Sequence, residues 1–337
     1  MDPAISRERL SALLAAAAGR RIAVVGDAML DVYLRGDVDR ISPEAPVPVV
    51  RVRERKLALG GAANVANNVA ALGAVPELVA AVGNEGYAGH ELRRMLDESG
   101  SSSRGLVDVA RPTTMKTRVI ARAQQVVRID EEEDADLTGP EVAAVLDAVR
   151  RAVAAADAVV LEDYNKGVLV PAVITQSIAW ARERGVPVIV DPKYRNFFSY
   201  RGASVFKPNR RELESALGAA VDLEHPAALL DTFARLGVEH LLLTLSERGM
   251  ALVSSRGDVQ RVETTAREVY DPVGAGDTVT AYLAVMLAAG ATAWEAAVIA
   301  NYAAGVEVGK PGAATVTAEE LLEAFDAHAE HAAAASD

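Results

Sequence analysis

The stretch from Asp271 to Val279, DPVGAGDTV, combines small residues with a carboxylate in a way that suits phosphoryl transfer. Gly274, Ala275 and Gly276 let backbone N–H groups converge on an anion, and a helix starting there adds partial positive charge. Asp277 follows, and an ionised carboxylate at that point can accept a proton from a substrate hydroxyl. An aspartate at a helix start is also a common N-cap, and the two roles are compatible.

Other phosphate-binding motifs are absent from the sequence. It contains no G-x-x-x-x-G-K-[ST] loop, GAGDTV lacks the third glycine of the dinucleotide fingerprint, and the protein-kinase motifs are missing. The five histidines show no metal-ligand spacing, and His328 and His331 lie in the tail. If the protein binds phosphate, it must therefore do so with a fold other than a P-loop, dinucleotide-binding or protein-kinase fold.

The composition is that of an acidic globular protein. The chain has 337 residues, a net charge of −12 and no cysteine. This charge disfavours a nucleic-acid or acidic-membrane surface, because phosphate backbones require clustered Lys and Arg. The lack of cysteine is consistent with a reducing compartment, so we expect a cytoplasmic protein. No apolar run reaches the ~18 residues needed to span a bilayer.

The N-terminal segment SRERLSALLAAAAGRR superficially resembles a secretory signal. Asp2 and Glu8 disfavour that interpretation, because they lie in the region that should be basic. Leu10, Leu13 and Leu14 fit one face of a short helix that leads into the first strand. We therefore expect this segment to be part of the fold.

Apolar strand-like runs alternate with helical patterns through most of the chain. Because these strands are apolar throughout, the alternation predicts an α/β fold, a three-layer α/β/α sandwich with a mostly parallel central sheet. The expected strands are 22–27, 77–83, 158–163, 187–192, 204–209, 240–246 and 249–255, and the clearest helices are 63–74, 89–100 and 171–185.

Polar residues follow the carboxyl ends of these strands, where open α/β sheets bind ligands. They are Asp27, Asp163, Asp191, Asn209 and Ser246. Asp163 is for this reason a candidate substrate ligand.

Two segments, 47–56 and 113–130, alternate with period two and predict a separate, half-exposed sheet. Such a sheet, inserted over 32–55 and 106–130, could be a lid over the site, a dimer surface or a solvated flap without function. Strands with unpaired edges could join two copies of the chain into a homodimer.

These features resemble the ribokinase, or PfkB, family of sugar kinases. DPVGAGDTVTAYLAVMLAAG is similar to the C-terminal signature of that family, and LGGAANVANNVAALGA (59–74) to its N-terminal signature. RISPEAPVPVV, DYNKG and DPK resemble the members that phosphorylate D-glycero-β-D-manno-heptose 7-phosphate. The resemblance covers residues 20–325 and implies a ribokinase-like kinase domain with an inserted β-lid. The low-complexity tail 326–337 is expected to fray.

The resemblance also implies roles for individual residues. Asp277 would be the catalytic base, and the N–H groups of Gly274, Ala275 and Gly276 would form the anion hole. The residues implied for the sugar hydroxyls are Asp31, Gly60, Gly61 and Asn64. The residues implied for ATP and its ions are Asn209 and Glu212 for Mg²⁺ and the phosphates, Ser246, Gly249 and Asn301 for the nucleotide, and Asp271 for a monovalent cation such as K⁺.

Each of these roles has a structural alternative. Gly60 and Gly61 could form an ordinary turn, and Asn64 could cap a helix. Asn209 and Glu212 are three residues apart, so they could form a simple capping interaction.

Several cations are candidates for binding phosphate. Lys166 and Lys193 follow strand ends and could meet a phosphate, or they could be solvated loop lysines. Lys116, Arg118 and Arg128 on the expected lid could bind a sugar phosphate, because an acidic chain needs such a local cluster for an anionic substrate.

We expect an ATP-dependent kinase that phosphorylates the heptose 7-phosphate at O1. The alternatives are a kinase of fructose phosphate, ribose or a nucleoside, and a non-catalytic sensor on the same fold. Glu162 replaces a small residue before DYNKG, and Pro272–Val273 departs from the residues usual in heptose kinases. Because the chain ends soon after the kinase signature, the following nucleotidyltransferase step is expected to belong to another protein.

Overall fold

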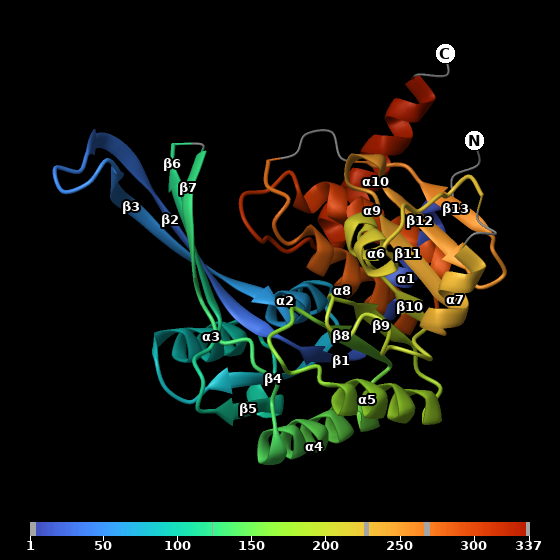
Figure 1. Cartoon of the computed structure of the whole chain (residues 1–337). Helices are drawn as coiled ribbons and strands as arrows, with labels where there is room; N and C mark the ends of the chain where they lie inside the picture. Colours follow the sequence, from blue (N-terminus) through green and yellow to red (C-terminus); the bar gives the residue numbers. More distant parts are fainter. Residues whose placement is uncertain (1–4, 123, 226–228, 266–269, 335–337) are drawn as a thin grey trace.

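A nine-stranded sheet forms the centre of the molecule (Figure 1). The strand order is β13-β12-β11-β10-β9-β8-β1-β4-β5, and all neighbouring pairs from β11 to β5 are parallel. The pairs β11–β12 and β12–β13 are antiparallel. The structure is a computed structural model that describes residues 5–122, 124–225, 229–265 and 270–334.

The strands of this sheet confirm the predicted alternation, with differences at their ends. They are β1 (Arg21–Gly26), β4 (Val75–Gly83), β5 (Leu106–Val109), β8 (Ala158–Glu162), β9 (Val188–Asp191), β10 (Val205–Phe206), β11 (His240–Thr244), β12 (Met250–Ser254) and β13 (Val259–Val262). The run predicted at 204–209 is a strand over two residues only, because Pro208 has no N–H to continue the ladder.

Helices cover both faces of the sheet. Ile22 and Val24 of β1 face one hydrophobic core, and Ala23 and Val25 face the other. The first core is covered by α1 (Arg7–Ala17), α2 (Ala62–Ala71), α3 (Tyr87–Glu98), α8 (Ala275–Ala288), α9 (Ala293–Glu307) and α10 (Ala318–Ala334). The second is covered by α4 (Gly139–Ala155), α5 (Pro171–Glu183), α6 (Arg210–Leu217) and α7 (Leu230–Leu236). This confirms the three-layer sandwich.

The two ends of the chain differ in how well the sequence predicted them. Leu10, Leu13 and Leu14 are buried on α1, as their spacing indicated. We expected the tail to fray from residue 326, but α10 continues to Ala334. Residues 335–337 of that tail lie outside the described residues. No helix among the described residues combines the length and apolar character that crossing a bilayer requires.

A second sheet of four strands projects from the side of the sandwich (Figure 1). Its strand order is β3-β2-β6-β7, with β2 (Ala28–Ile41), β3 (Pro48–Gly61), β6 (Met115–Ala121) and β7 (Gln124–Glu131). The segment 106–130 was expected to belong wholly to this sheet, but β5 at its start pairs with β4 in the main sheet. Because β5 is an edge strand of the main sheet, the chain returns to the small sheet only after Val109.

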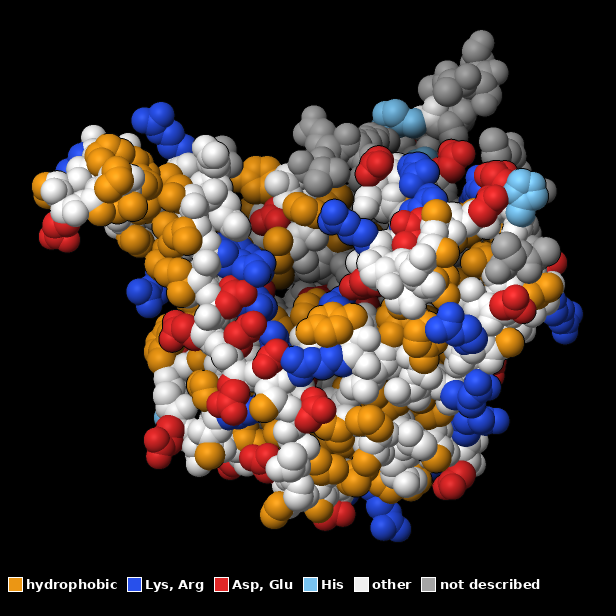
Figure 2. Space-filling view, in the orientation of Figure 1, with side chains coloured by type: hydrophobic (Ala, Val, Ile, Leu, Met, Phe, Trp, Pro, Cys, Tyr) orange, Lys and Arg blue, Asp and Glu red, His pale blue; other side chains and the backbone are white. Residues whose placement is uncertain are grey.

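The small sheet leaves many apolar side chains in solvent. Figure 2 shows hydrophobic side chains along the projecting arm. The exposed ones are Ile41, Val52, Val126, Val127 and Ile129 on its strands and Val47 in the loop between β2 and β3. Two strands, β3 and β7, form the outer edges of the sheet.

Candidate active site

The candidate base lies at the start of α8, where the chain turns sharply. Gly274 is the N-cap and has φ 102°, a conformation that favours glycine. Asp277 is the third residue of the helix and is 4% exposed. Its side chain does not cap the helix, so the structural alternative suggested by its position in the sequence is wrong.

Two side chains hold the carboxylate of Asp277. The Asn64 amide donates to Oδ2 at 2.8 Å, and the Tyr164 hydroxyl donates to Oδ1 at 2.7 Å. Burial raises the pKa of Asp277 to about 6, against the lowering effect of these two donors. A carboxylate with such a pKa is ionised at neutral pH but still basic enough to accept a proton.

A buried ion pair lies directly behind the turn of Gly274, Ala275 and Gly276. Lys207 Nζ is 2.8 Å from Asp191 Oδ2, and both side chains are almost fully buried. A Cβ added to Gly276 would lie 3.8 Å from each of these two atoms. The turn therefore combines backbone N–H groups with a nearby ammonium group, as binding an anion requires.

The turn forms one wall of a cavity of about 360 Å³. Among its lining residues are Ala275 and Gly276 from the turn, and Ser246, Gly249 and Asn301 from the implied nucleotide residues. Gly249 has φ 75°, and a Cβ there would lie 2.0 Å from the carbonyl oxygen of Val262. The structure thus brings these five residues together, although they span more than fifty positions of the sequence.

Asn209 and Glu212 form a reciprocal capping box at the start of α6, which confirms their structural alternative. The Glu212 backbone N–H donates to Asn209 Oδ1 at 2.8 Å, and the Asn209 N–H donates to Glu212 Oε2 at 2.9 Å. Lys193 donates to Glu212 Oε1 at 2.6 Å, so it is not a solvated loop lysine. Capping does not conflict with ion binding, because each carboxylate oxygen keeps a lone pair.

Of the implied sugar residues, Asn64 contacts Asp277, and Asp31 lies beside Gly60. Asp31 on β2 accepts a hydrogen bond of 2.6 Å from Arg118 and is 4% exposed. A Cβ on Gly60 would lie 2.9 Å from Asp31 Oδ2, so glycine is needed there. A Cβ on Gly61 would lie 3.4 Å from the Tyr164 ring. Asn64 is not a helix cap, since Gly61 holds that position in α2.

The three cations predicted to bind phosphate, Lys116, Arg118 and Arg128, are all paired with carboxylates, and so is Lys166 in the loop after β8. Lys116 Nζ lies 2.9 Å from Glu132 and 3.2 Å from Asp130. Lys166 Nζ lies 2.9 Å from the other oxygen of Glu132, and Arg128 pairs with Asp130 at 2.9 Å. The side chains of Lys116 and Lys166 are largely covered, at 13% and 15% exposure, so Lys166 is not a solvated loop lysine.

Asp163 has a structural role in this molecule. It accepts hydrogen bonds from the Tyr200 hydroxyl and from the backbone N–H of Asn165, both at 2.7 Å. Burial and the charge of Asp27 raise its pKa to about 6. These bonds shape the DYNKG loop, and a contact between Asp163 and a substrate stays a prediction.

Asp271 also holds a loop in place. Its two carboxylate oxygens accept backbone N–H groups from Val273 at 3.0 Å and from Gly312 at 3.1 Å. The carboxyl of Glu307 lies close by, since a Cβ on Gly274 would be 2.9 Å from its Oε1.

Sequence reasoning missed Tyr164 and Lys207, and it named Asp191 only as a polar residue at a strand end. Tyr164 bonds Asp277, and Asp191 and Lys207 form the pair behind the anion turn. Lys207 is 3% exposed, and its signal was a lone charge at the end of an apolar strand. Such a charge is rarely buried without a partner, so it could have been matched with a strand-end carboxylate. The hydroxyl of Tyr164 gave no signal of this kind.

Comparison with known proteins identifies the family. The model of the pfkB family of carbohydrate kinases matches residues 20–320. The chain belongs to this family. Carbohydrate kinases of the pfkB family transfer a phosphoryl group from ATP to an alcohol group of the sugar. The match includes both the turn before Asp277 and the Gly60–Gly61 segment.

Curated relatives in the pfkB family include bacterial proteins named bifunctional protein HldE. The one from Rhodospirillum rubrum is 45% identical over 96% of this chain and 65% of its own length. The one from Caulobacter sp. strain K31 is 46% identical over 98% of this chain and 67% of its own length. The chain thus spans about two thirds of the length of the relatives that it matches.

Solved structures of a ribokinase and of a phosphofructokinase share the fold at low identity. Arabidopsis thaliana ribokinase, complexed with ribose and ATP, superposes with a TM-score of 0.72 at 22% identity, covering 91% of this chain and 99% of that chain. Escherichia coli phosphofructokinase-2, in complex with substrates and products, has a TM-score of 0.75 at 19% identity, covering 91% and 98%. The ribokinase-like α/β fold with its small inserted sheet is therefore confirmed.

Proposed function

We propose that this pfkB kinase phosphorylates D-glycero-β-D-manno-heptose 7-phosphate at O1, giving the 1,7-bisphosphate for synthesis of nucleotide-activated heptose of the lipopolysaccharide core. The observation that carries the proposal is the position of Asp277 between two groups of residues. On one side lies the cavity with Ser246, Gly249 and Asn301. On the other side Asn64 and Tyr164 connect Asp277 to the small sheet.

In the proposed reaction the O1 hydroxyl takes the place of the Tyr164 hydroxyl at Asp277. The proton of O1 moves to the Asp277 carboxylate while O1 forms a bond to the γ-phosphorus of ATP. The bond between the γ-phosphorus and the bridging oxygen breaks, and ADP leaves. Since phosphoryl transfer is loose, positioning and charge neutralisation contribute more than the base. The N–H groups of the turn and the Lys207 ammonium would neutralise charge on the moving group.

The residues present fit the proposed Mg²⁺ ion. Asn209 and Glu212 offer oxygen atoms, the ligand type that Mg²⁺ prefers, and each oxygen keeps a lone pair for a water of the ion. When bound, Mg²⁺ would neutralise charge on the ATP phosphates.

The surroundings of Asp271 fit a monovalent cation such as K⁺. Both oxygens of Glu307 are buried, and neither makes a hydrogen bond of normal geometry within the described part of the chain. Burial raises the pKa of Glu307 to about 8, and the charges of Asp277 and Asp271 also raise it. The nearby Ala314 amide lowers this pKa, but its effect is smaller than that of burial. A bound cation would compensate both carboxylates, Asp271 and Glu307, at the base of the turn.

The 7-phosphate of the sugar would bind at Lys116 and Lys166. Both ammonium groups converge on one carboxylate, Glu132, which occupies the position of an anion between them. A phosphate dianion carries more charge than a carboxylate and could displace it. Arg118 is committed to Asp31 by a buried ion pair, so we assign it to positioning Asp31 rather than to the phosphate.

We expect Lys116→Met to raise the KM for heptose 7-phosphate about 10- to 100-fold, because a charge-assisted contact worth about 1.5–3 kcal/mol is lost. The KM for ATP should not change. The measurement is ADP release across a panel of heptose 7-phosphate, unphosphorylated heptose, fructose 6-phosphate and ribose. Lys56→Met, an exposed lysine on β3 of the same sheet, is the matched control. Preference for an unphosphorylated sugar would contradict the proposal.

The exposed apolar side chains of the small sheet support a homodimer formed through this lid. A second copy would cover the outer strands β3 and β7, whose edges have no partner strand within the described residues. We expect Val127→Lys to convert the dimer to monomer in sedimentation velocity, because it places a charge in the interface. Val75→Lys, an equally exposed valine on β4, should leave the dimer intact. A dimer that survives Val127→Lys must use another surface.

A further inference from the structure

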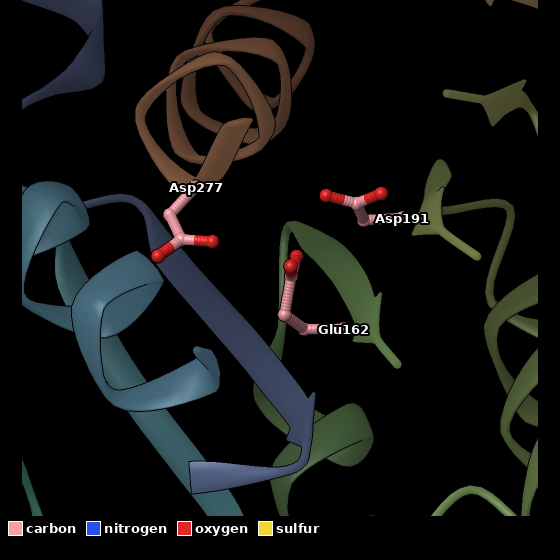
Figure 3. Close-up of side chains that lie close together, drawn as sticks. All are labelled: Glu162, Asp191 and Asp277. Carbon is pink, nitrogen blue, oxygen red and sulfur yellow. The ribbon is translucent and has the colours of Figure 1, made fainter. Parts of the chain in front are cut away.

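Glu162 is a buried carboxyl for which the proposed reaction has no role. It is the last residue of β8 and is 0% exposed. Figure 3 shows its carboxyl group pointing toward Asp191 and Asp277. One oxygen from each of these three residues lies within 4.8 Å of the others. Neither oxygen of Glu162 has a hydrogen bond of normal geometry among the described residues.

The cations around Glu162 are already engaged with other carboxylates. Lys207, which follows β10, pairs with Asp191 at 2.8 Å, and Lys193, which follows β9, pairs with Glu212 at 2.6 Å. The carboxyl of Asp277 on α8 is held by neutral donors, Asn64 and Tyr164, and by no cation among the described residues. An ionised Glu162 would therefore be a further buried negative charge with no cation of its own, which is strongly unfavourable.

We propose that Glu162 is a neutral carboxylic acid in the folded enzyme and acts as a positioning residue. Its proton would be directed at Asp191, which has a carboxylate oxygen within 4.8 Å and which in turn holds Lys207 beside Gly276. Since a Cβ on Gly276 would lie 3.8 Å from both Asp191 Oδ2 and Lys207 Nζ, a shift of this pair would move the ammonium relative to the turn. A neutral Glu162 also limits the negative charge next to Asp277.

The electrostatics of the cluster agree with this arrangement. Burial raises the pKa of Glu162 well above its usual value, and Asp191 and Asp277 raise it further, against the lowering effect of Lys207 and Lys193. For Asp191, burial raises the pKa, but the charges of Lys207 and Lys193 lower it overall. One carboxyl of the pair thus holds a proton and the other does not.

The proposal predicts how stability depends on pH. In the unfolded chain Glu162 loses its proton near its ordinary pKa of about 4.3. In the folded enzyme it keeps the proton to higher pH, so folding takes up a proton and wild-type stability falls as pH rises through this window. Gln has the same shape and is always neutral, so Glu162→Gln removes this loss.

The experiment compares thermal unfolding of wild type and Glu162→Gln at pH 5, 6, 7 and 8 without nucleotide. We expect the variant to gain in Tm relative to wild type by at least about 2 °C between pH 5 and pH 8. Glu183→Gln, an exposed glutamate at the end of α5, should show a constant difference from wild type. If Glu162→Gln does not fold, Glu162→Met provides the same comparison. A difference that does not change with pH would overturn the proposal.

Two further measurements separate this proposal from its alternatives. If Glu162 were instead a ligand of a divalent cation, Mg²⁺ without nucleotide would raise the Tm of wild type but not that of Glu162→Gln, and the proposal would fail. As a donor to Asp191, Gln should support a kcat about tenfold higher than Met does, whereas equal kcat values would refute the positioning role. The positioning role rests on the proposed function, but the unfolding test does not. A wild-type enzyme that does not phosphorylate heptose 7-phosphate would refute the proposed function and leave the pH dependence of unfolding intact.

Discussion

Replacement of Asp277 by Asn is expected to lower kcat by about 10²- to 10⁴-fold, because the amide cannot accept the proton of the sugar hydroxyl. The fold should persist. Burial raises the pKa of Asp277, so an ionised Asp277 costs stability above its ordinary pKa, and a neutral Asn removes that cost. ADP release at pH 7.5 measures the effect, and circular dichroism checks the fold. Asp97→Asn, an exposed aspartate on α3, is the matched control.

The same residue predicts the acidic side of the pH profile. Asp277 must be ionised to act as a base, and its pKa is raised to about 6. We therefore expect kcat/KM to fall about tenfold per pH unit below pH 6 and to level off above it. An Asp277→Asn enzyme with wild-type kcat, or a wild-type profile that stays flat down to pH 4.5, would remove Asp277 from the role of base.

The sequence predicted the layers of the fold because hydrophobic periodicity reports burial directly. Continuous apolar strands such as 158–163 must be covered on both faces, and this is enough to place helices on both sides. It could not predict β5 or β13, since these short edge strands, LVDV and VQRV, have exposed polar residues between their apolar ones. Nor could it assign 106–109 to the main sheet, because strand pairing depends on contacts between segments distant in sequence.

The sequence predicted those parts of the site that have a local signal and missed the contacts between distant residues. The glycines before Asp277 are a local signal, since a sharp turn at a helix start requires them. The contact between Asn64 and Asp277 joins residues 213 positions apart and has no local signal. The cations Lys116, Arg118 and Arg128 were expected to be available for phosphate, but each is paired with a carboxylate. A sequence shows the charges and does not show which of them neutralise one another.

Replacement of Lys207 by Met is expected to lower the free energy of unfolding by about 3–5 kcal/mol, the range for breaking one side of a buried ion pair. Asp191 would be left as an unpaired charge beside Glu162 and Asp277. Asp191 would then have to gain a proton, or water would have to enter the site. Chemical denaturation at pH 7 measures the loss, and a loss below about 1 kcal/mol would show that the pair is solvated.

The double variant Lys207→Met with Asp191→Asn separates stability from catalysis. Removing both charges leaves no unpaired ion, so most of the lost stability should return. Activity should not return, because the ammonium beside Gly276 is still missing and the turn has lost its nearest positive charge. If both properties recover together, Lys207 only holds the fold. If stability alone recovers, its charge at the turn is needed for phosphoryl transfer.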